Sequence, residues 1–321
     1  MTQRIVFSIV AAAFAATIAH AQSYPARPVR LLVPSTPGGS VDTLARSVAS
    51  ELSEKWGQQV VVDNRAGAGG VIAADTAAKA VPDGYTLLMC TVSSCATTVS
   101  LHKNLPYDPV RDFAPVTLVA TQNLMLVMNP SIPAKSVKDL VALAKASPGK
   151  YSFASAGNGT GSHLSGELFK LLAGIDLLHV PYKGVATGLI DTISGQISMN
   201  FPSILSGTPH VKSGKLRPLA VTGAKRSATF PELPTMMEAG VKSYESATWY
   251  GVLAPAKTPK PIVTKLNTDI VAILRQPEVR ERISKDGAEP IGNTSEQFGA
   301  YIKAEIAKWA KVIKAAKITA N

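Results

Sequence analysis

The sequence holds few of the residues on which catalytic and metal sites are usually built. Its 321 residues include 2 cysteines and 5 histidines, and aromatic residues make up 6%. It contains no GKS or GKT phosphate loop, no G-x-S-x-G nucleophile elbow and no H-E-x-x-H zinc motif. Two glycine runs, at 67–72 and 157–162, fall short of the dinucleotide-binding fingerprint. These absences argue against P-loop enzymes, serine hydrolases, zinc proteases and dinucleotide-dependent dehydrogenases.

Charged residues are also sparse, at 17% of the chain, but their balance is basic, with a formal net charge of +11. A basic protein can bind nucleic acid, an anionic surface or small anions. The low aromatic content and the lack of a helix-turn-helix, zinc-finger or RNA-recognition signature argue against nucleic acid as a partner. Hydrophobic residues make up 46% of the sequence, which predicts a globular chain with a substantial core.

A long hydrophobic run occurs at the N-terminus. Arg4 precedes an apolar stretch at 5–18, and residues 19–21 (Ala-His-Ala) place small side chains where a signal peptidase cleaves. The stretch is too short to span a bilayer comfortably, and no lipobox cysteine follows it. We therefore predict that residues 1–21 are a signal peptide removed near Ala21 and that the mature protein is periplasmic. An amphipathic start of a cytoplasmic protein is the alternative.

The two cysteines, Cys90 and Cys95, are close enough in sequence to form a small-loop disulfide in an oxidising compartment. The residues between them, 91–94, would then have to turn sharply. Two free thiols are the second interpretation. A metal site is the third, and it is disfavoured because no histidine lies close enough to supply a further ligand. The sequence leaves the disulfide and the free thiols open, with the disulfide as the first interpretation.

Strand and helix patterns alternate through the first part of the chain. Apolar strands are predicted at 29–33, 60–62 and 85–89, and apolar residues at helical spacing predict helices at 41–56 and 72–80. Ser40 is a suitable N-cap for the first of these helices. The β-α-β-α-β order predicts a parallel sheet with helices on both faces.

A second series of elements begins near residue 122. Its predicted strands lie at 124–128, 177–180, 197–201 and 216–221, and its predicted helices at 137–145 and 189–193. The final third has a strand at 249–254 and helices from 261 onward, too little sheet to stand alone, so it most simply completes the first sheet. We predict an α/β protein of two lobes, 22–121 with 246–321 and 122–245, whose strand-end loops meet at a shared crevice.

Residues 151–169 carry the clearest ligand-binding pattern. An apolar strand runs into a turn containing Gly157, Gly159 and Gly161 and then into an amphipathic helix. Glycines let the backbone approach a ligand closely, and Thr160, Ser162 and the first free amides of the helix can donate hydrogen bonds to an anion. A well-capped turn with no ligand is the alternative. The pattern predicts an anion-binding loop.

The first strand-to-helix turn, at 34–40, repeats this design, so two helix N-termini are predicted to face one crevice and bind a carboxylate or dicarboxylate. Asp42 follows in the first helical turn, where it favours the helix dipole. Holding a hydroxyl or cationic part of a ligand is the sharper alternative for Asp42. Ser162 and His163 are not a nucleophile and base, because adjacent helix residues point in different directions. We expect His163 to cap or pack.

A family resemblance rests on segments that occur in a fixed order: Tyr24–Arg30, Pro37–Asp42 with Ala45 and Arg46, Asn64–Gly70, Pro82–Tyr85, Leu105–Pro109, Tyr151–Phe169, His179–Gly184, and Trp249–Gly251 with Ala254 and Pro255. With these segments the chain resembles the extracytoplasmic solute receptors of tripartite tricarboxylate transporters, the Bug-type receptors. The resemblance covers essentially the whole mature sequence.

The resemblance implies a type II periplasmic binding protein, in which two lobes, each with a mixed, mostly parallel sheet flanked by helices, close on a small organic acid in the cleft between them. It implies a monomer without enzymatic activity or cofactor. Its ligand would be a di- or tricarboxylate, an acidic amino acid or an aromatic acid, delivered to a membrane transporter of the tripartite tricarboxylate type. An exported hydrolase using Ser162, His163 or a cysteine thiolate, and a sensory receptor without a transporter, remain the alternatives.

The expected ligand contacts follow from the matching positions. The resemblance places one carboxylate at the loops of the first lobe and the other polar end of the ligand at the glycine loop of the second. The contacts, with Asp42 added from its position in the helix, are Ser35, Thr36, Gly38, Gly39, Ser40, Asp42, Thr91, Ser93, Ser94, Ser155, Gly157, Asn158, Gly159, Thr160, Ser162, His163, Tyr182 and Ser203. Cys90 and Cys95 flank a loop where the family commonly has glycine and small polar residues. If the two cysteines join, this wall of the pocket is reshaped, and the identity of the ligand does not carry over from relatives.

Overall fold

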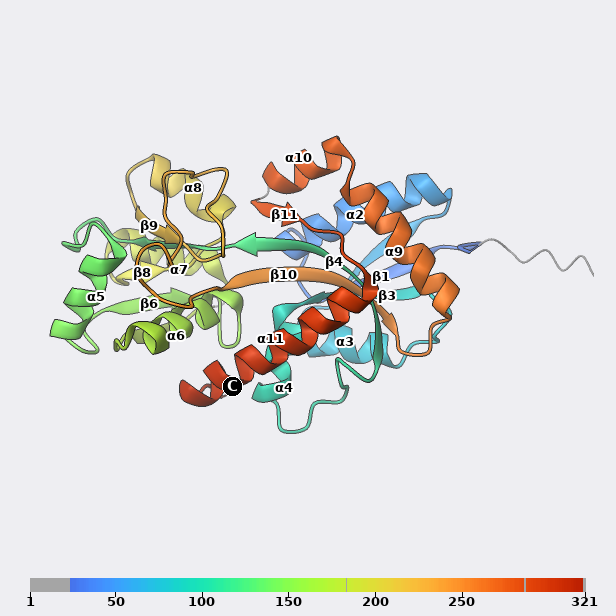
Figure 1. Ribbon diagram of the computed structural model, residues 1–321, viewed down its shortest axis with the longest axis horizontal. Coiled ribbons are helices and arrows are strands. Elements are labelled where there is room, and N and C mark those ends of the chain that lie inside the picture. Colours follow the sequence, from blue (N-terminus) through green and yellow to red (C-terminus); the bar gives the residue numbers. More distant parts are fainter. Residues whose placement is uncertain (1–23, 183, 286, 320–321) are drawn as a thin grey trace, which may run out of the picture.

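The computed structural model describes residues 24–182, 184–285 and 287–319 (Figure 1). The predicted signal peptide, residues 1–21, lies outside these ranges. Within them, no helix combines the length and the apolar character needed to cross a membrane. The strands form two separate sheets, one in each half of the molecule, and helices pack on both.

The first sheet has six strands in the order β11-β4-β10-β3-β1-β2. Its members are β1 (Val29–Val33), β2 (Val60–Asn64), β3 (Thr86–Thr91), β4 (Phe113–Asn123), β10 (Ala247–Pro255) and β11 (Ala288–Pro290). β1 runs parallel to β2 and β3, as the alternating pattern predicts, whereas β10 is antiparallel to both β3 and β4, and β11 is antiparallel to β4. The sheet is mixed, with a larger antiparallel share than expected.

The second sheet has five strands in the order β7-β6-β8-β5-β9. They are β5 (Met125–Met128), β6 (Ser152–Ser155), β7 (Leu178–Pro181), β8 (Met199–Asn200) and β9 (Arg217–Val221). β6 is parallel to β7 and β8, and β5 is antiparallel to β8 and β9. The carboxyl ends of β6, β7 and β8 therefore lie along one edge of this sheet.

The helices follow the strands closely in sequence. They are α2 (Ser40–Trp56), α3 (Val71–Ala78), α4 (Thr98–Leu101), α5 (Val137–Ala146), α6 (Gly161–Ala173), α7 (Val185–Ser194), α8 (Ile204–Lys212), α9 (Lys260–Leu274), α10 (Pro277–Lys285) and α11 (Ser295–Ala315), with a 3-10 turn η2 (Ala68–Gly70) and a π-helical turn η3 (Ser93–Thr97). α2, α5 and α9 lie within a residue or so of the predicted helices, because their buried residues recur at helical spacing.

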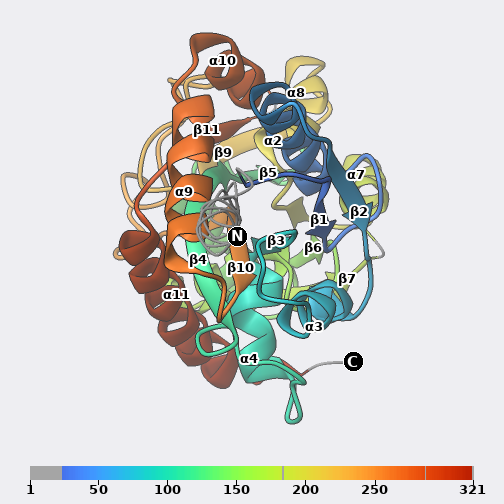
Figure 2. The ribbon, with the colours of Figure 1, turned by 90° about the vertical axis from the view of Figure 1, so that its right-hand side faces the viewer.

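The first sheet is buried on both faces, which is why its central strands read as continuous apolar runs. Leu31 and Leu87 pack on the side of α2, α9 and α10, and the next residues along the strands, Leu32 and Leu88, pack on the side of α3 and α11. In Figure 2 α2 and α10 lie above this sheet, and α3 and α4 lie below it. The core therefore holds the carboxyl ends of β1 and β3 in a fixed place.

Two long paired strands, β4 and β10, connect the halves, and only β10 was predicted, at 249–254. β4 and β10 pair along their whole length, from Phe113 opposite Pro255 to Asn123 opposite Ala247, and Figure 1 shows both strands extending from one half toward the other. No element was predicted at 113–121, because Pro115 interrupts the pattern. The strand accommodates Pro115 beside a register shift in its pairing with β10. The predicted lobe boundaries, 121/122 and 245/246, fall at the ends of this pair and stay a prediction.

Candidate functional site

Four helices that follow parallel strands begin without a side-chain cap. The N-cap residues of α2, α3, α6 and α7 are Gly39, Gly70, Thr160 and Gly184, and none of them accepts a side-chain hydrogen bond from its helix within the part of the chain that is described. By contrast, α5, α8 and α11 are capped by the side chains of Ser136, Ser203 and Thr294. Uncapped N-termini leave backbone N–H groups free for an anion.

The turn before α2 is held together by Asp42. This carboxylate is 2% exposed and accepts hydrogen bonds from the Gly38 amide (2.8 Å), Arg46 Nε (3.0 Å) and Asn64 Nδ2 (2.9 Å). Burial alone would raise the pKa of Asp42, but these hydrogen bonds outweigh it and hold the pKa below its usual value. Asp42 therefore shapes the turn and favours the helix dipole, and its oxygens are already used within the protein.

The segment after β3 is helical, where the sequence predicted only a strand end. Ser94 is fully buried, and its Oγ accepts from the Thr91 amide at 3.0 Å, while its carbonyl accepts from the Tyr107 hydroxyl at 2.6 Å. Thr97 and Thr98 place their hydroxyls on carbonyls one turn back, at 3.4 Å in both cases. Serine and threonine have low helix propensity, so the sequence of this turn gave no helix signal. The turn is helical because its burial in the folded protein outweighs that low propensity.

Cys90 and Cys95 are free thiols in the structure, which agrees with the second interpretation rather than with a disulfide. Cys90 is the penultimate residue of β3 and Cys95 lies in η3, and both side chains are fully buried in the core. Burial, together with the neighbouring Cys95, raises the pKa of the Cys90 thiol. Across the described ranges, no three His, Cys, Asp or Glu side chains are grouped as metal ligands.

The glycine loop between β6 and α6 uses many of its own donors. The Ala156 amide donates to Ser162 Oγ (2.9 Å), the Gly157 amide to Ser155 Oγ (3.1 Å), and the Gly159 amide to His163 Nδ1 (3.0 Å). Thr160 Oγ1 donates to the Gly157 carbonyl at 2.7 Å. The side chains of Ser162 and Thr160 therefore stabilise the turn, whereas sequence reasoning assigned them to the ligand.

The first three backbone N–H groups of α6 have no acceptor among the described residues. No described residue accepts a hydrogen bond from the N–H groups of Gly161, Ser162 or His163; the first intrahelical bond runs from Leu164 to Thr160. The same holds for Ser40, Val41 and Asp42 in α2, where the first bond runs from Thr43 to Gly39. Each of these helices therefore presents a short run of unpaired amides at the end of a strand.

Two histidines lie under the glycine loop. The rings of His163 and His179 stack with centroids 3.8 Å apart and planes 9° apart, and Phe153 stacks on His179. His179 Nε2 lies 2.7 Å from Ser155 Oγ. Burial is the main cause that lowers the pKa of His163 to about 3 and that of His179 to about 4. The expectation that His163 caps or packs is confirmed, since Nδ1 accepts from Gly159 and the ring stacks on His179. Both rings are neutral near pH 7 and are weak bases, because their pKa values are low.

The two halves meet at the glycine loop. Ser93 Oγ and Thr97 Oγ1 both donate to the Gly159 carbonyl, each at 3.3 Å. A Cβ on Gly159 would lie 2.6 Å from Leu101 Cδ1, and one on Gly70 would lie 2.9 Å from both Pro34 and Ser94. The loop at 34–40, the η2 turn and η3 therefore adjoin one another, and η3 contacts the loop of the other half. Thr97, Leu101 and His179 were missed by sequence reasoning; strand pairing of Phe153 with His179 was the available signal.

The hydroxyl groups of Tyr182 and Ser203, both predicted ligand contacts, form hydrogen bonds within the protein. The Tyr182 hydroxyl donates to Asp191 Oδ2 at 2.5 Å, and burial together with this hydrogen bond raises the pKa of Tyr182 to about 12. Ser203 Oγ accepts from the Ser206 amide and caps α8. Of the other predicted contacts, Thr36, Gly38 and Ser40 are exposed and Ser35 and Gly39 are half-buried at the α2 turn. Asn158 stands within the glycine loop, half-buried.

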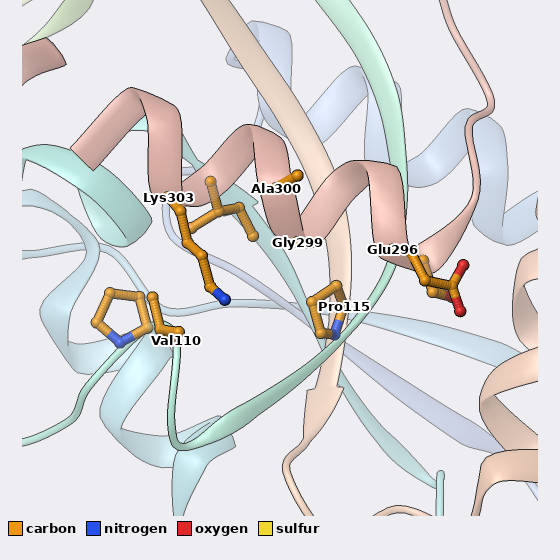
Figure 3. Close-up of a pocket in the computed structure, with 9 residues that line it drawn as sticks. Val110, Pro115, Glu296, Gly299, Ala300 and Lys303 are labelled. Carbon is orange, nitrogen blue, oxygen red and sulfur yellow. The ribbon is translucent and has the colours of Figure 1, made fainter. Parts of the chain in front are cut away.

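One surface groove lies away from the predicted ligand contacts. One groove of about 450 Å³ runs between the start of α11 and the segment before β4, lined by Val110, Pro115, Gly299, Ala300 and Ile302 among others (Figure 3). Glu296 and Lys303 stand at its two ends in that view. None of the predicted ligand contacts lines this groove, so its position gives no support to the candidate site.

Comparison with known proteins defines the class and then the family. Among solved structures, R. palustris Rpa4515 with adipate has a TM-score of 0.83 and 41% identity, covering 92% of this chain and 99% of that one. MatC from Rhodopseudomonas palustris with bound malate has a TM-score of 0.78 and 31% identity, covering 90% and 100%. The fold is that of a two-lobed, type II periplasmic solute-binding protein.

The sequence matches identify the family. Residues 44–318 match the tripartite tricarboxylate transporter family receptor. The protein BugT of Bordetella pertussis is 39% identical over 307 residues, which is 95% of this chain and 94% of BugT. The chain belongs to the tripartite tricarboxylate transporter receptor family, and the resemblance found in its motifs is confirmed. Its relatives are solute receptors for small ligands rather than enzymes.

Proposed function

We propose that this protein is a periplasmic receptor that binds a small carboxylated metabolite between its lobes and delivers it to a membrane transporter of the tripartite tricarboxylate type. The observation that carries the proposal is the pair of unpaired amide runs, at 40–42 in α2 and at 161–163 in α6. Each run adds the partial positive charge of a helix N-terminus to its free N–H groups. Two such runs, one in each half, suit a ligand with two anionic or polar ends.

Lobe closure is the proposed mechanism. The loop at 155–163 and η3 are joined through the Gly159 carbonyl, so contacts between the halves exist at the edge of the proposed cleft. A ligand that binds both amide runs is bound more tightly by the closed state, and this difference in affinity shifts the balance between open and closed states. The paired strands β4 and β10 are the proposed hinge, with lobes at 22–121 plus 246–321 and at 122–245. The receptor is proposed to act as a monomer.

The chemistry of the candidate nucleophiles supports release of the ligand unchanged. Ser162 Oγ accepts from the Ala156 amide, and His163 Nδ1 accepts from the Gly159 amide, so the two side chains are not paired with each other. Burial raises the pKa of the Cys90 thiol, which disfavours a thiolate nucleophile. No observation favours the hydrolase over the receptor.

Thermal unfolding with a panel of acids tests the proposal. The relatives bound to adipate and malate make these two acids the first probes, followed by succinate, citrate, aspartate and benzoate. A ligand at a hundredfold excess over its dissociation constant should stabilise the protein by about 2.7 kcal/mol. If no acid of the panel moves the melting temperature and none co-purifies in mass spectrometry, the receptor proposal fails. Capture of the membrane subunits on immobilised protein tests the transporter as partner.

A further inference from the structure

Asn200 lies at the carboxyl end of β8, the middle strand of the second sheet. It pairs with Val127 of β5 on one side and with Ala154 of β6 on the other. Ala154 is followed by Ser155, where the glycine loop begins, so Asn200 is one residue from the start of the candidate site. Ligands of open α/β sheets bind at the carboxyl ends of the parallel strands. Sequence reasoning did not select Asn200, because a polar residue in an apolar strand gives no motif.

The side chain of Asn200 is 1% exposed, and neither Nδ2 nor Oδ1 has a hydrogen-bond partner among the described residues. No other described residue has two such atoms. Asn129 shows what a satisfied amide looks like in the same half: its Nδ2 donates to the carbonyls of Thr192 and Ile193, and its Oδ1 accepts from Ser131. Burial of an unpaired amide opposes folding, so its presence at Asn200 points to a ligand.

The surroundings of Asn200 belong to the edge of the crevice. A Cβ on Gly188, in the first turn of α7, would lie 3.2 Å from Asn200 Nδ2 and 3.3 Å from Tyr182 Cδ2. Asn200 therefore lies against the beginning of a helix that has no side-chain cap, beside the ring of Tyr182, which directly follows β7. An unpaired amide and an uncapped helix start are two independent observations at one place.

We propose that Asn200 binds a hydroxyl group on the ligand and makes the receptor selective for hydroxylated carboxylic acids. An amide offers a donor and an acceptor side by side. A hydroxyl accepts from Nδ2 and donates to Oδ1 and so satisfies both atoms, whereas a carboxylate only accepts and leaves Oδ1 unpaired. A site built around a hydroxyl rejects the analogue that lacks it, because its own polar atoms are then left without a partner. This inference rests on the proposed receptor function.

Malate and succinate, which differ by one hydroxyl, are the probes. Isothermal titration should give a dissociation constant about tenfold or more lower for malate than for succinate with the mature protein. In Asn200→Leu the preference disappears through loss of malate affinity, while succinate affinity changes less than threefold and the melting temperature is unchanged or higher, because an apolar side chain removes the unpaired amide. Asn200→Ala gives the same loss of preference should the leucine fail to fold.

Thr192→Val is the matched control. Thr192 is fully buried in α7, and its hydroxyl donates to the Gly188 carbonyl at 2.7 Å. This variant loosens the same helix but leaves the amide of Asn200 in place, so the preference for malate persists. A wild-type protein that binds both acids equally overturns the inference, as does a preference that survives in Asn200→Leu or an equal loss of both acids. Failure of the whole acid panel overturns the receptor function itself.

Discussion

His163 and His179 stack face to face beneath the glycine loop, with ring centroids 3.8 Å apart and planes 9° apart. The two rings come from α6 and β7, and they connect the loop to the sheet, since His163 accepts from the Gly159 amide and His179 lies against Ser155. This arrangement disfavours charge on either ring, because burial penalises an imidazolium ion and two such ions at this distance repel each other. The stability of the loop therefore depends on pH.

Acid should destabilise the fold through this pair. The pKa of His163 is lowered to about 3 and that of His179 to about 4, below the unfolded value near 6.5. Between these values the unfolded chain binds more protons, so the free energy of unfolding falls as the pH drops from about 6.5 toward about 4, by about 2 kcal/mol per histidine over two pH units. Urea unfolding at several pH values measures it. His163→Asn, which keeps an acceptor for Gly159, should flatten the slope; an unchanged slope contradicts the assignment.

A side chain at Gly159 should separate the halves. Its φ is +73°, and a Cβ would lie 2.6 Å from Leu101 Cδ1 across the contact. Gly159→Ala is expected to lower the free energy of unfolding by about 1 kcal/mol because of the positive φ, and to weaken binding of the best acid of the panel by about tenfold or more. Gly174→Ala is the matched control, since Gly174 has a φ of +60° and nothing within 4 Å. Equal affinity in the two variants would show that closure does not involve this contact.

Both thiols should be protected in the folded protein. Cys90 and Cys95 are free and fully buried, and burial raises the pKa of Cys90. A chromogenic aromatic disulfide that reacts with accessible thiols should therefore detect almost no thiol at pH 8 under native conditions. In guanidinium it should detect both thiols. Protein isolated from the periplasm that shows no thiol even when denatured would mean that the pair is oxidised in the cell.

Neutralising Asp42 should loosen the turn before α2. Asp42 is buried, and its pKa is low because Arg46, Gly38 and Asn64 bond to its charged form. Asp42→Asn leaves these donors poorly matched and is expected to lower the free energy of unfolding by about 1–3 kcal/mol at pH 7. The loss should shrink as the pH falls below about 4, because the unfolded chain then takes up a proton at Asp42 and the stability that comes from the low native pKa is lost. Asp139→Asn, at an exposed position of α5, is the control. A loss of stability equal to that of Asp42→Asn would contradict the role of Asp42 in holding the turn.

The sequence predicts the elements whose burial follows a simple period. α2 and α9 alternate buried and exposed faces at helical spacing, and β1 and β3 are apolar runs that pack on both sides. β4 and η3 could not be predicted in this way. β4 contains Pro115 and is stabilised by pairing with β10, more than a hundred residues away in sequence, and η3 is rich in serine and threonine and helical only because it is buried.

The candidate site was located by its glycines, but its chemistry depended on pairing between distant residues. The loop at 155–163 lies where the pattern placed it, yet the hydroxyls of Ser162 and Thr160 bond within the loop. Which amides stay unpaired is decided by the position of His163 Nδ1 and Ser155 Oγ in space. Asn200 was invisible for the same reason, since its lack of a partner is a property of the packed sheet.

One carboxylate links β10, a strand of the proposed hinge, to α11, the longest helix in the described part of the chain. Glu305 of α11 accepts from the indole of Trp249 on β10 at 2.9 Å and from that of Trp309 at 2.8 Å. The protein has three tryptophans, and two of them share a single acceptor beside the strand on which the halves would pivot. Excitation at the indole band should consequently follow the motion without any attached dye, as a change in emission intensity on a stopped-flow timescale.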